Sequence, residues 1–145
     1  MAGNTIPFRL RHLDHVVLRA RDGDALVRFY REVLGCTLER ESAEVGLVQL
    51  RAGDALIDIV PVDGRLGRAG GSPPLPRDGH NVDHLCLRVD PFDSAAITAH
   101  LKRHGAEPTE VRHVYGAEGF GPSIYVDDPE GNTVELKGPA TAAEP

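Results

Sequence analysis

Two histidines and two carboxylates occupy similar places in the two halves of the sequence. His15 and His84 each follow an aspartate at the start of a short apolar stretch. Asp58 and Glu135 each interrupt an apolar stretch further along their own half. Imidazole nitrogens and carboxylate oxygens are common ligands of divalent transition metals. The residue types therefore make His15, His84, Asp58 and Glu135 candidate metal ligands.

Each of these side chains also has an ordinary structural explanation. A single strand histidine is more often hydrogen-bonded or exposed than bound to a metal, and a carboxylate at a strand edge can simply be solvated. An acid within a buried strand, in contrast, costs several kcal/mol unless it is paired or binds a cation. Two histidines with two matching acids favour ligation over these alternatives, whereas for Asp58 alone both interpretations stay open.

An internal repeat places the two histidines at equivalent positions. Residues 13–20 and 82–89 share aspartate, histidine, leucine and arginine in register. A helical pattern follows each copy, at 24–34 and at 94–104, and is closed by a glycine suited to a left-handed C-cap. Side chains alternate along a strand, so both histidines point away from the apolar face that packs on the helix. An approximate two-fold axis would then bring both histidines to a shared centre.

The elements that position these residues form the same pattern in each half. Three strand-like stretches follow each helix, separated by turn signals such as Asp-Pro-Glu-Gly-Asn at 128–132. The predicted strands are residues 37–42, 45–51 and 55–62 in the first half, and 109–114, 123–127 and 133–137 in the second. The predicted fold class is therefore α+β, with two βαβββ modules. The modules span 13–62 and 80–138, joined by a linker at 63–79 and followed by a flexible tail at 139–145.

The composition is that of an ordinary globular protein. The chain has 145 residues, of which 41% are hydrophobic, so one domain with a substantial core is expected. A net charge of -6 argues against a nucleic-acid partner, which needs a basic surface. No stretch reaches the ~20 apolar residues that span a bilayer, and no signal-peptide pattern precedes the first module. These features predict a cytoplasmic protein whose partner is a small molecule.

Four motifs resemble the vicinal oxygen chelate superfamily, also called the glyoxalase/bleomycin resistance/dioxygenase fold. They are Leu-Asp-His at 13–15, Phe-Tyr-Arg-Glu-Val-Leu-Gly at 29–35, Val-Asp-His at 82–84, and the segment 128–136. The resemblance covers residues 13–137. It implies that the two modules curl around a common cavity and that the two histidines and the glutamate hold a metal there.

The ligand set leaves several divalent metals open, and the resemblance implies the chemistry. Lactoylglutathione lyase of the bacterial type has a fourth ligand, a glutamate, where this sequence has Asp58. Two histidines with one or two carboxylates and waters suit nickel, manganese, iron, cobalt or zinc. In a lyase or isomerase of this kind, Glu135 or Asp58 removes a proton next to a metal-polarised carbonyl, and Arg19 contacts the carboxylate of glutathione. Asp58 in place of glutamate, and Val62 in place of an asparagine, depart from that pattern.

Three other functions stay open within the resemblance. A thiol transferase of the fosfomycin-resistance type would contact its substrate through Ser123 and Tyr125, although Val17 replaces its threonine near the metal. An extradiol-type dioxygenase would use the same His-His-Glu triad, but such enzymes are typically much longer. A non-catalytic drug-binding protein, as among bleomycin-binding relatives, would lack the metal ligands. The resemblance further implies a homodimer, with the cavity either completed across subunits or formed by two modules of one chain.

Overall fold

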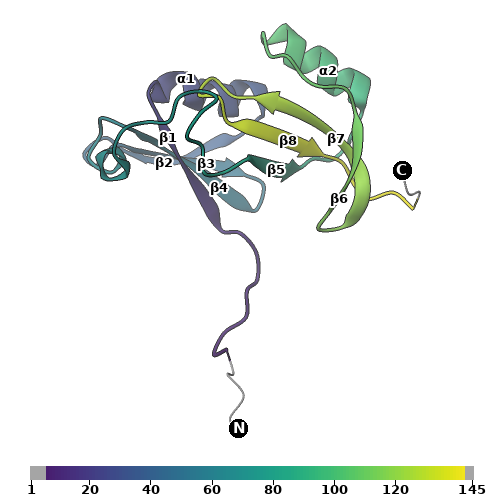
Figure 1. The fold of residues 1–145 in the computed structure, drawn as a ribbon, viewed down its shortest axis with the longest axis horizontal. Helices are drawn as coiled ribbons and strands as arrows, with labels where there is room; N and C mark the ends of the chain where they lie inside the picture. Colours follow the sequence, from purple (N-terminus) through teal and green to yellow (C-terminus); the bar gives the residue numbers. More distant parts are fainter. Residues whose placement is uncertain (1–5, 143–145) are drawn as a thin grey trace.

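Two four-stranded mixed sheets, one from each half of the chain, form the frame of the protein (Figure 1). The computed structural model describes residues 6–142. The strand order is β1-β4-β3-β2 in the first sheet and β5-β8-β7-β6 in the second. The strands are β1 (His15–Ala20), β2 (Thr37–Ser42), β3 (Leu47–Ala52), β4 (Ala55–Pro61), β5 (His84–Arg88), β6 (Arg112–Gly116), β7 (Gly119–Asp127) and β8 (Thr133–Lys137). The repeated topology confirms the predicted α+β fold with two βαβββ modules.

A helix connects the first two strands of each module. Helix α1 (Gly23–Arg28) continues into a π-helical turn, η1 (Phe29–Val33), and α2 (Ser94–Arg103) is the counterpart in the second module. Asp22 and Asp93 start the two α-helices, because each side chain accepts a hydrogen bond of 3.0 Å from a free backbone amide of the first turn. The single helix predicted over 24–34 therefore exists as two segments that differ in hydrogen-bond pattern.

The register of the two sheets repeats the relation between histidine and acid. Strand β1 runs parallel to β4 with Val17 opposite Asp58, and β5 runs parallel to β8 with Cys86 opposite Glu135. Each histidine lies two residues before the residue that faces the acid. Since side chains two apart share a face, each half places its histidine and its carboxylate on one face of its sheet.

Burial separates the two faces of the edge strand β1. In β1, Leu18 and Ala20 are buried, whereas His15 and Val17 are exposed. One continuous hydrophobic core joins both modules, and it is built from helix and strand residues such as Tyr30 and Leu101. Both helices lie on the same side of the sheets in Figure 1. The histidine-bearing faces therefore form the open side of the chain.

The Asp-Pro-Glu-Gly-Asn turn also ties the two modules together. The buried hydroxyl of Tyr30, in η1, donates to Asp128 Oδ2 at 2.8 Å. The other oxygen of Asp128 accepts from the backbone amides of Glu130 and Asn132, at 2.9 Å each. The carboxylate of Glu130 in turn accepts from the backbone amide of Asp22 at 2.8 Å. A motif that reads as a turn signal in the sequence is thus also a contact between modules.

The connecting and terminal segments are more structured than their composition suggests. The linker at 63–79 contains a short 3-10 helix, Gly67–Gly70, and Arg19 donates to the Gly67 carbonyl at 3.0 Å. In the tail, the Thr141 amide donates to the Phe120 carbonyl at 2.7 Å, while residues 143–145 lie outside the described chain.

Within residues 6–142, no helix is long and apolar enough to cross a membrane.

The largest departure from the predicted strands lies at the β6–β7 hairpin. The sequence pattern predicts strands at 109–114 and 123–127, with the glycine-rich segment between them as a loop. In the structure both strands extend into this segment, and pairs from Arg112 opposite Ser123 to Gly116 opposite Gly119 close a tight hairpin. The glycines here are compatible with strand pairing because a backbone without side chains can approach its neighbours closely.

Candidate metal centre in two half-sites

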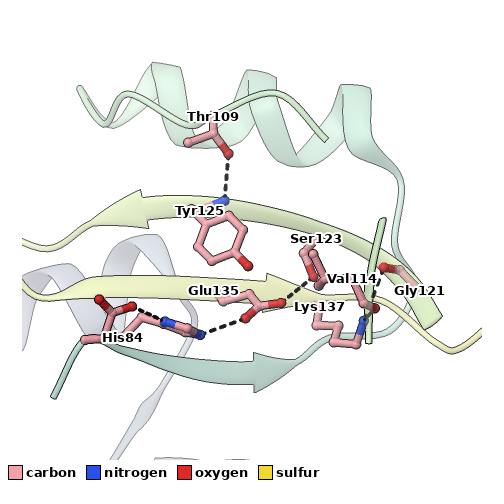
Figure 2. A network of polar contacts seen from close by, with 9 residues as sticks. His84, Thr109, Val114, Gly121, Ser123, Tyr125, Glu135 and Lys137 are labelled. Carbon is pink, nitrogen blue, oxygen red and sulfur yellow. Dashed lines mark hydrogen bonds and ion pairs between the residues drawn. The ribbon is translucent and has the colours of Figure 1, made fainter. Parts of the chain in front are cut away.

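The second module brings His84 and Glu135 into direct contact (Figure 2). Nε2 of His84 lies 3.1 Å from Oε2 of Glu135, and Nδ1 of the same ring lies 2.7 Å from the Asp83 carboxylate. A carboxylate on one ring nitrogen fixes the ring orientation and leaves the other nitrogen to a metal, as outer carboxylates do for ligand histidines. We call Asp83, His84, Ser123 and Glu135 the second half-site.

The Glu135 carboxylate is buried and held from behind. It is 5% exposed, and the fully buried Ser123 donates to its Oε1 at 2.6 Å. The Tyr125 ring meets the His84 ring edge-on, with centroids 5.7 Å apart. Burial, and then the charge of Glu135, raise the pKa of Tyr125. Tyr125 therefore stays neutral near pH 7 and can donate a hydrogen bond toward this carboxylate.

The first module contains the corresponding set of side chains. Nδ1 of His15 lies 2.6 Å from the Asp14 carboxylate. Asp58 is 4% exposed, and its Oδ2 accepts from Gln49 Nε2 at 3.0 Å. Within the described residues 6–142, the buried Oδ1 of Asp58 has no hydrogen-bond partner. The hydrogen bond with Asp14 raises the pKa of His15, and the charge of Asp58 adds to this effect. We call Asp14, His15, Gln49 and Asp58 the first half-site.

Both half-sites fit a divalent cation. Nitrogen and oxygen ligands about 2.1 Å from one ion and at right angles to each other are about 3.0 Å apart. The separation of 3.1 Å between His84 and Glu135 matches that arrangement. The unpaired oxygen of Asp58 is also explained by a cation, because a buried carboxylate oxygen without a partner is otherwise costly.

A single chain does not gather the complete predicted ligand set. Within the part of the chain that the structure describes, no group of three His, Cys, Asp or Glu side chains lies close enough to hold one ion. His84 and Glu135 are in contact, and the charge of Asp58 contributes to the raised pKa of His15. The two pairs nevertheless stay separate. Ligation by these four residues remains a prediction.

The three predicted substrate contacts have other partners in the structure. Arg19 donates to carbonyl groups of the linker at Gly67, Gly71 and Ser72. Ser123 is fully buried behind Glu135, so its hydroxyl orients the carboxylate. Tyr125 lines a cavity of about 440 Å³ together with His84. Contact with a substrate stays a prediction for each of them.

Sequence reasoning did not assign roles to four residues that shape these half-sites: Asp14, Asp83, Gln49 and Lys137. The repeat does contain the signal for the first two, because an aspartate precedes the histidine in both copies. Lys137 shares a face with Glu135 by strand alternation, which the sequence also contains. Gln49 lies opposite Asp58 through the β3–β4 register, which the short turn at 53–54 sets.

The fold and the half-sites define a class of protein in which two βαβββ modules each offer a histidine and a carboxylate on an open sheet face. The chain belongs to the Glyoxalase/Bleomycin resistance protein/Dioxygenase superfamily, whose sequence profile matches residues 12–136. This match confirms the family resemblance.

Solved structures with the same fold carry names that describe different functions. A virulence protein from Salmonella typhimurium is 24% identical, with a TM-score of 0.72, over 92% of this chain and 100% of that one. A lactoylglutathione lyase from Agrobacterium tumefaciens is 24% identical, with a TM-score of 0.62, over 88% and 92%. An antibiotic-binding protein from a Streptomyces species is 20% identical, with a TM-score of 0.66, over 92% and 99%. These similarities establish the fold and leave the activity to the site.

Proposed function

We propose that this protein is a divalent-metal-dependent lyase or isomerase resembling lactoylglutathione lyase, acting on a small oxygen-bearing substrate. Its proposed metal ligands are His15, Asp58, His84 and Glu135. The observation that carries the proposal is the repeated register, which puts a histidine and a buried carboxylate on the open face of each sheet. A purely structural pair would not need to recur in both modules, nor leave an oxygen of Asp58 unpaired.

We further propose that a second copy of the chain completes the centre. The side chains of His15 and His84 are 46% and 36% exposed, and the neighbouring Val17 is 49% exposed. An exposed apolar side chain beside an exposed candidate ligand suits a covered face. In a two-fold dimer, the first half-site of one protomer can face the second half-site of the other, so that two centres form. The cytoplasmic location predicted from the sequence remains part of this proposal.

The proposed mechanism assigns separate tasks to the side chains of the second half-site. A bound divalent ion would act as a Lewis acid on a substrate carbonyl or hydroxyl oxygen. Glu135 is the candidate base, because Ser123 fixes one of its oxygens while the other lies beside the His84 ring, where the metal-bound substrate would be. Asp83 holds the His84 ring in place. Tyr125 covers the carboxylate and limits the access of water.

Metal content and turnover test this proposal together. Purified protein is analysed for metals, stripped with a chelator and titrated with nickel, cobalt, manganese or zinc. The reconstituted protein is then assayed with the hemithioacetal of methylglyoxal and glutathione. We expect tight binding of one ion per pair of half-sites and turnover with at least one metal. His84→Ala should abolish both, whereas the exposed His104→Ala serves as the matched control. Protein that binds none of the four metals would contradict the proposal.

A non-catalytic drug-binding function is the second candidate, because an antibiotic-binding protein shares this fold over nearly its whole length. That function needs no metal ligands. It predicts that the chelator-treated protein binds an aromatic antibiotic such as bleomycin as tightly as untreated protein does, and that His84→Ala leaves this binding unchanged. Metal-dependent turnover together with no antibiotic binding would rule it out.

A further inference from the structure

Lys137 is a buried cation on the same face of β8 as Glu135. It is 5% exposed, and its Nζ donates to the carbonyl oxygens of Val114 at 2.6 Å and Gly121 at 3.2 Å (Figure 2). Within residues 6–142 the ammonium group makes no ion pair. A buried charge is costly without a counterion, and two carbonyl groups leave one of the three ammonium protons available. The position therefore suits an anion that is absent from the chain itself.

The β6–β7 hairpin is shaped around this lysine. A Cβ atom at Gly116 would lie 2.6 Å from Cε of Lys137, so a larger residue at position 116 would displace the lysine or the hairpin. The carbonyl groups that hold the ammonium, at Val114 and Gly121, belong to the same hairpin. The backbone of the hairpin thus covers the aliphatic part of Lys137, and its carbonyl groups hold the ammonium group in place.

Arg88 places a second positive charge beside the first. It lies directly opposite Lys137 in the β5–β8 register, on the same face of the sheet. Like charges directly opposite each other in a sheet are destabilising unless something compensates them. Part of the compensation comes from Glu118, at the tip of the hairpin, whose carboxylate accepts from Arg88 Nε at 2.8 Å. The Glu118 side chain is 54% exposed, so this partner is accessible to exchange.

The two cations line one cavity together with His84 and Glu135 of the second half-site. Its volume is about 360 Å³, at the small end of the range of ~300–1,000 Å³ for small-molecule sites. It is lined by side chains that include His84, Cys86, Arg88, Glu118, Glu135 and Lys137. Alternate residues of a strand are ~7 Å apart, so the cavity has an acidic end at Glu135 and a basic end about one such step away.

We propose that Arg88 and Lys137 form a subsite for the carboxylate of a small substrate, and that Glu118 occupies this subsite until the substrate carboxylate displaces it. The proposal rests on the proposed function for the other end of the cavity, where the reacting oxygens would bind. A carboxylate is favoured because the guanidinium of Arg88 already binds one, and its planar fork matches that group. The ligand class is then a small acid with an oxygen function a few atoms from its carboxylate.

The probes are succinate, its uncharged analogue succinamide, and inorganic phosphate. Each is titrated into the full-length chain, once with the metal that it binds and once after chelator treatment. Binding is followed by isothermal titration calorimetry and by the backbone amide resonances of Gly116 and Gly119. We expect succinate to bind in preference to the other two and to shift the hairpin resonances.

Three variants separate a binding role from a structural one. Arg88→Met and Lys137→Met should each weaken succinate binding about tenfold or more, as expected for a lost charged hydrogen bond. Glu118→Gln should tighten it several-fold, because the competing carboxylate is gone, and a structural role would not predict this gain. Glu44→Gln removes the same charge in the first module and should change nothing. If Lys137→Met fails to fold, Arg88→Met and Glu118→Gln still decide the question.

Each outcome bears on the inference. It is overturned if succinate and succinamide bind equally, if Glu118→Gln does not tighten binding, or if phosphate binds more tightly than succinate. If the parent protein binds the metal but not succinate, the carboxylate subsite is contradicted while the proposed function is not. Succinate binding by a protein that holds no metal would support the subsite and contradict the proposed function.

Discussion

The two half-sites share one strand register, but only in the second does the carboxylate contact the histidine ring. In the second half-site, Glu135 reaches His84 with an oxygen 3.1 Å from the ring nitrogen. In the first, Asp58 makes no hydrogen bond to His15, and one of its oxygens has no partner within residues 6–142. The backbone positions are equivalent, and the side chain of Asp58 is one methylene group shorter than that of Glu135. Equal topology therefore does not produce equal chemistry in the two modules.

The supporting residues differ in the same direction. Gln49 lies opposite Asp58, whereas Tyr125 occupies the corresponding place opposite Glu135. Glu135 also has a buried donor in Ser123. In the second half-site the histidine and the carboxylate are thus held in contact. In the first they are apart, and one carboxylate oxygen is available to another ligand. The comparison suggests that the second half-site dominates metal affinity, while the first adds a weaker contribution.

The largest effect is expected from neutralising the acids one at a time. Glu135→Gln should lower metal affinity by at least about 100-fold, more than outer-shell changes, which typically cost about 10–100-fold. Asp58→Asn should cost about tenfold, because its contribution is the weaker one. Calorimetric titration with zinc measures both. Equal losses in the two variants would contradict the inequality of the half-sites.

The turns that close the two modules should also differ. Asp128→Ala removes the acceptor of the buried Tyr30 hydroxyl and of two backbone amides. We expect a loss of about 2–3 kcal/mol in the free energy of unfolding, measured by urea denaturation. Asp54→Ala, in the corresponding exposed turn of the first module, should stay within about 0.5 kcal/mol of the parent. Similar losses would show that the two turns contribute equally.

Lengthening the shorter acid tests the cause of the asymmetry. Asp58→Glu restores the missing methylene group and should let the first half-site close on His15. We expect metal affinity to rise about tenfold, the equivalent of ~1.4 kcal/mol. The converse change, Glu135→Asp, should open the second half-site and lower the affinity. An affinity that is unchanged by Asp58→Glu would show that Asp58 takes no part in ligation.

The smallest effect concerns the protonation of His15 in metal-free protein. Its pKa is raised in the fold, first by the Asp14 carboxylate. The stabilisation from the charged ring is therefore complete below the unfolded value of about 6.5 and is lost as the pH rises through the higher folded value. Asp14→Asn should move the NMR titration of His15 to lower pH. Asp83→Asn, in the other half-site, should leave the His15 titration unchanged, and an equal shift in both variants would contradict the assignment.

The sequence contained enough information to predict most of the fold. The repeated Asp-His strand, the capped helices and the turn signals each depend on residues close together in the chain, so local propensities predict βαβββ modules correctly. The family match confirms that prediction. The hairpin at 116–119 was not predicted, because its glycines resemble a flexible loop until a partner strand is known. The break between α1 and η1 was missed because both obey a helical spacing.

The candidate site was predictable only in part. Strand alternation and the repeat were sufficient to place His15 and His84 on matching faces, and the apolar surroundings of Asp58 and Glu135 marked them as unusual acids. By itself the sequence determined which residue types lie on which face, since that depends on a period of two along a strand. Only the tertiary structure decided which faces are covered, which acid reaches its histidine, and that the hairpin buries Lys137 beside Arg88. Those outcomes depend on contacts between distant segments, where a single methylene group or a strand register changes the result.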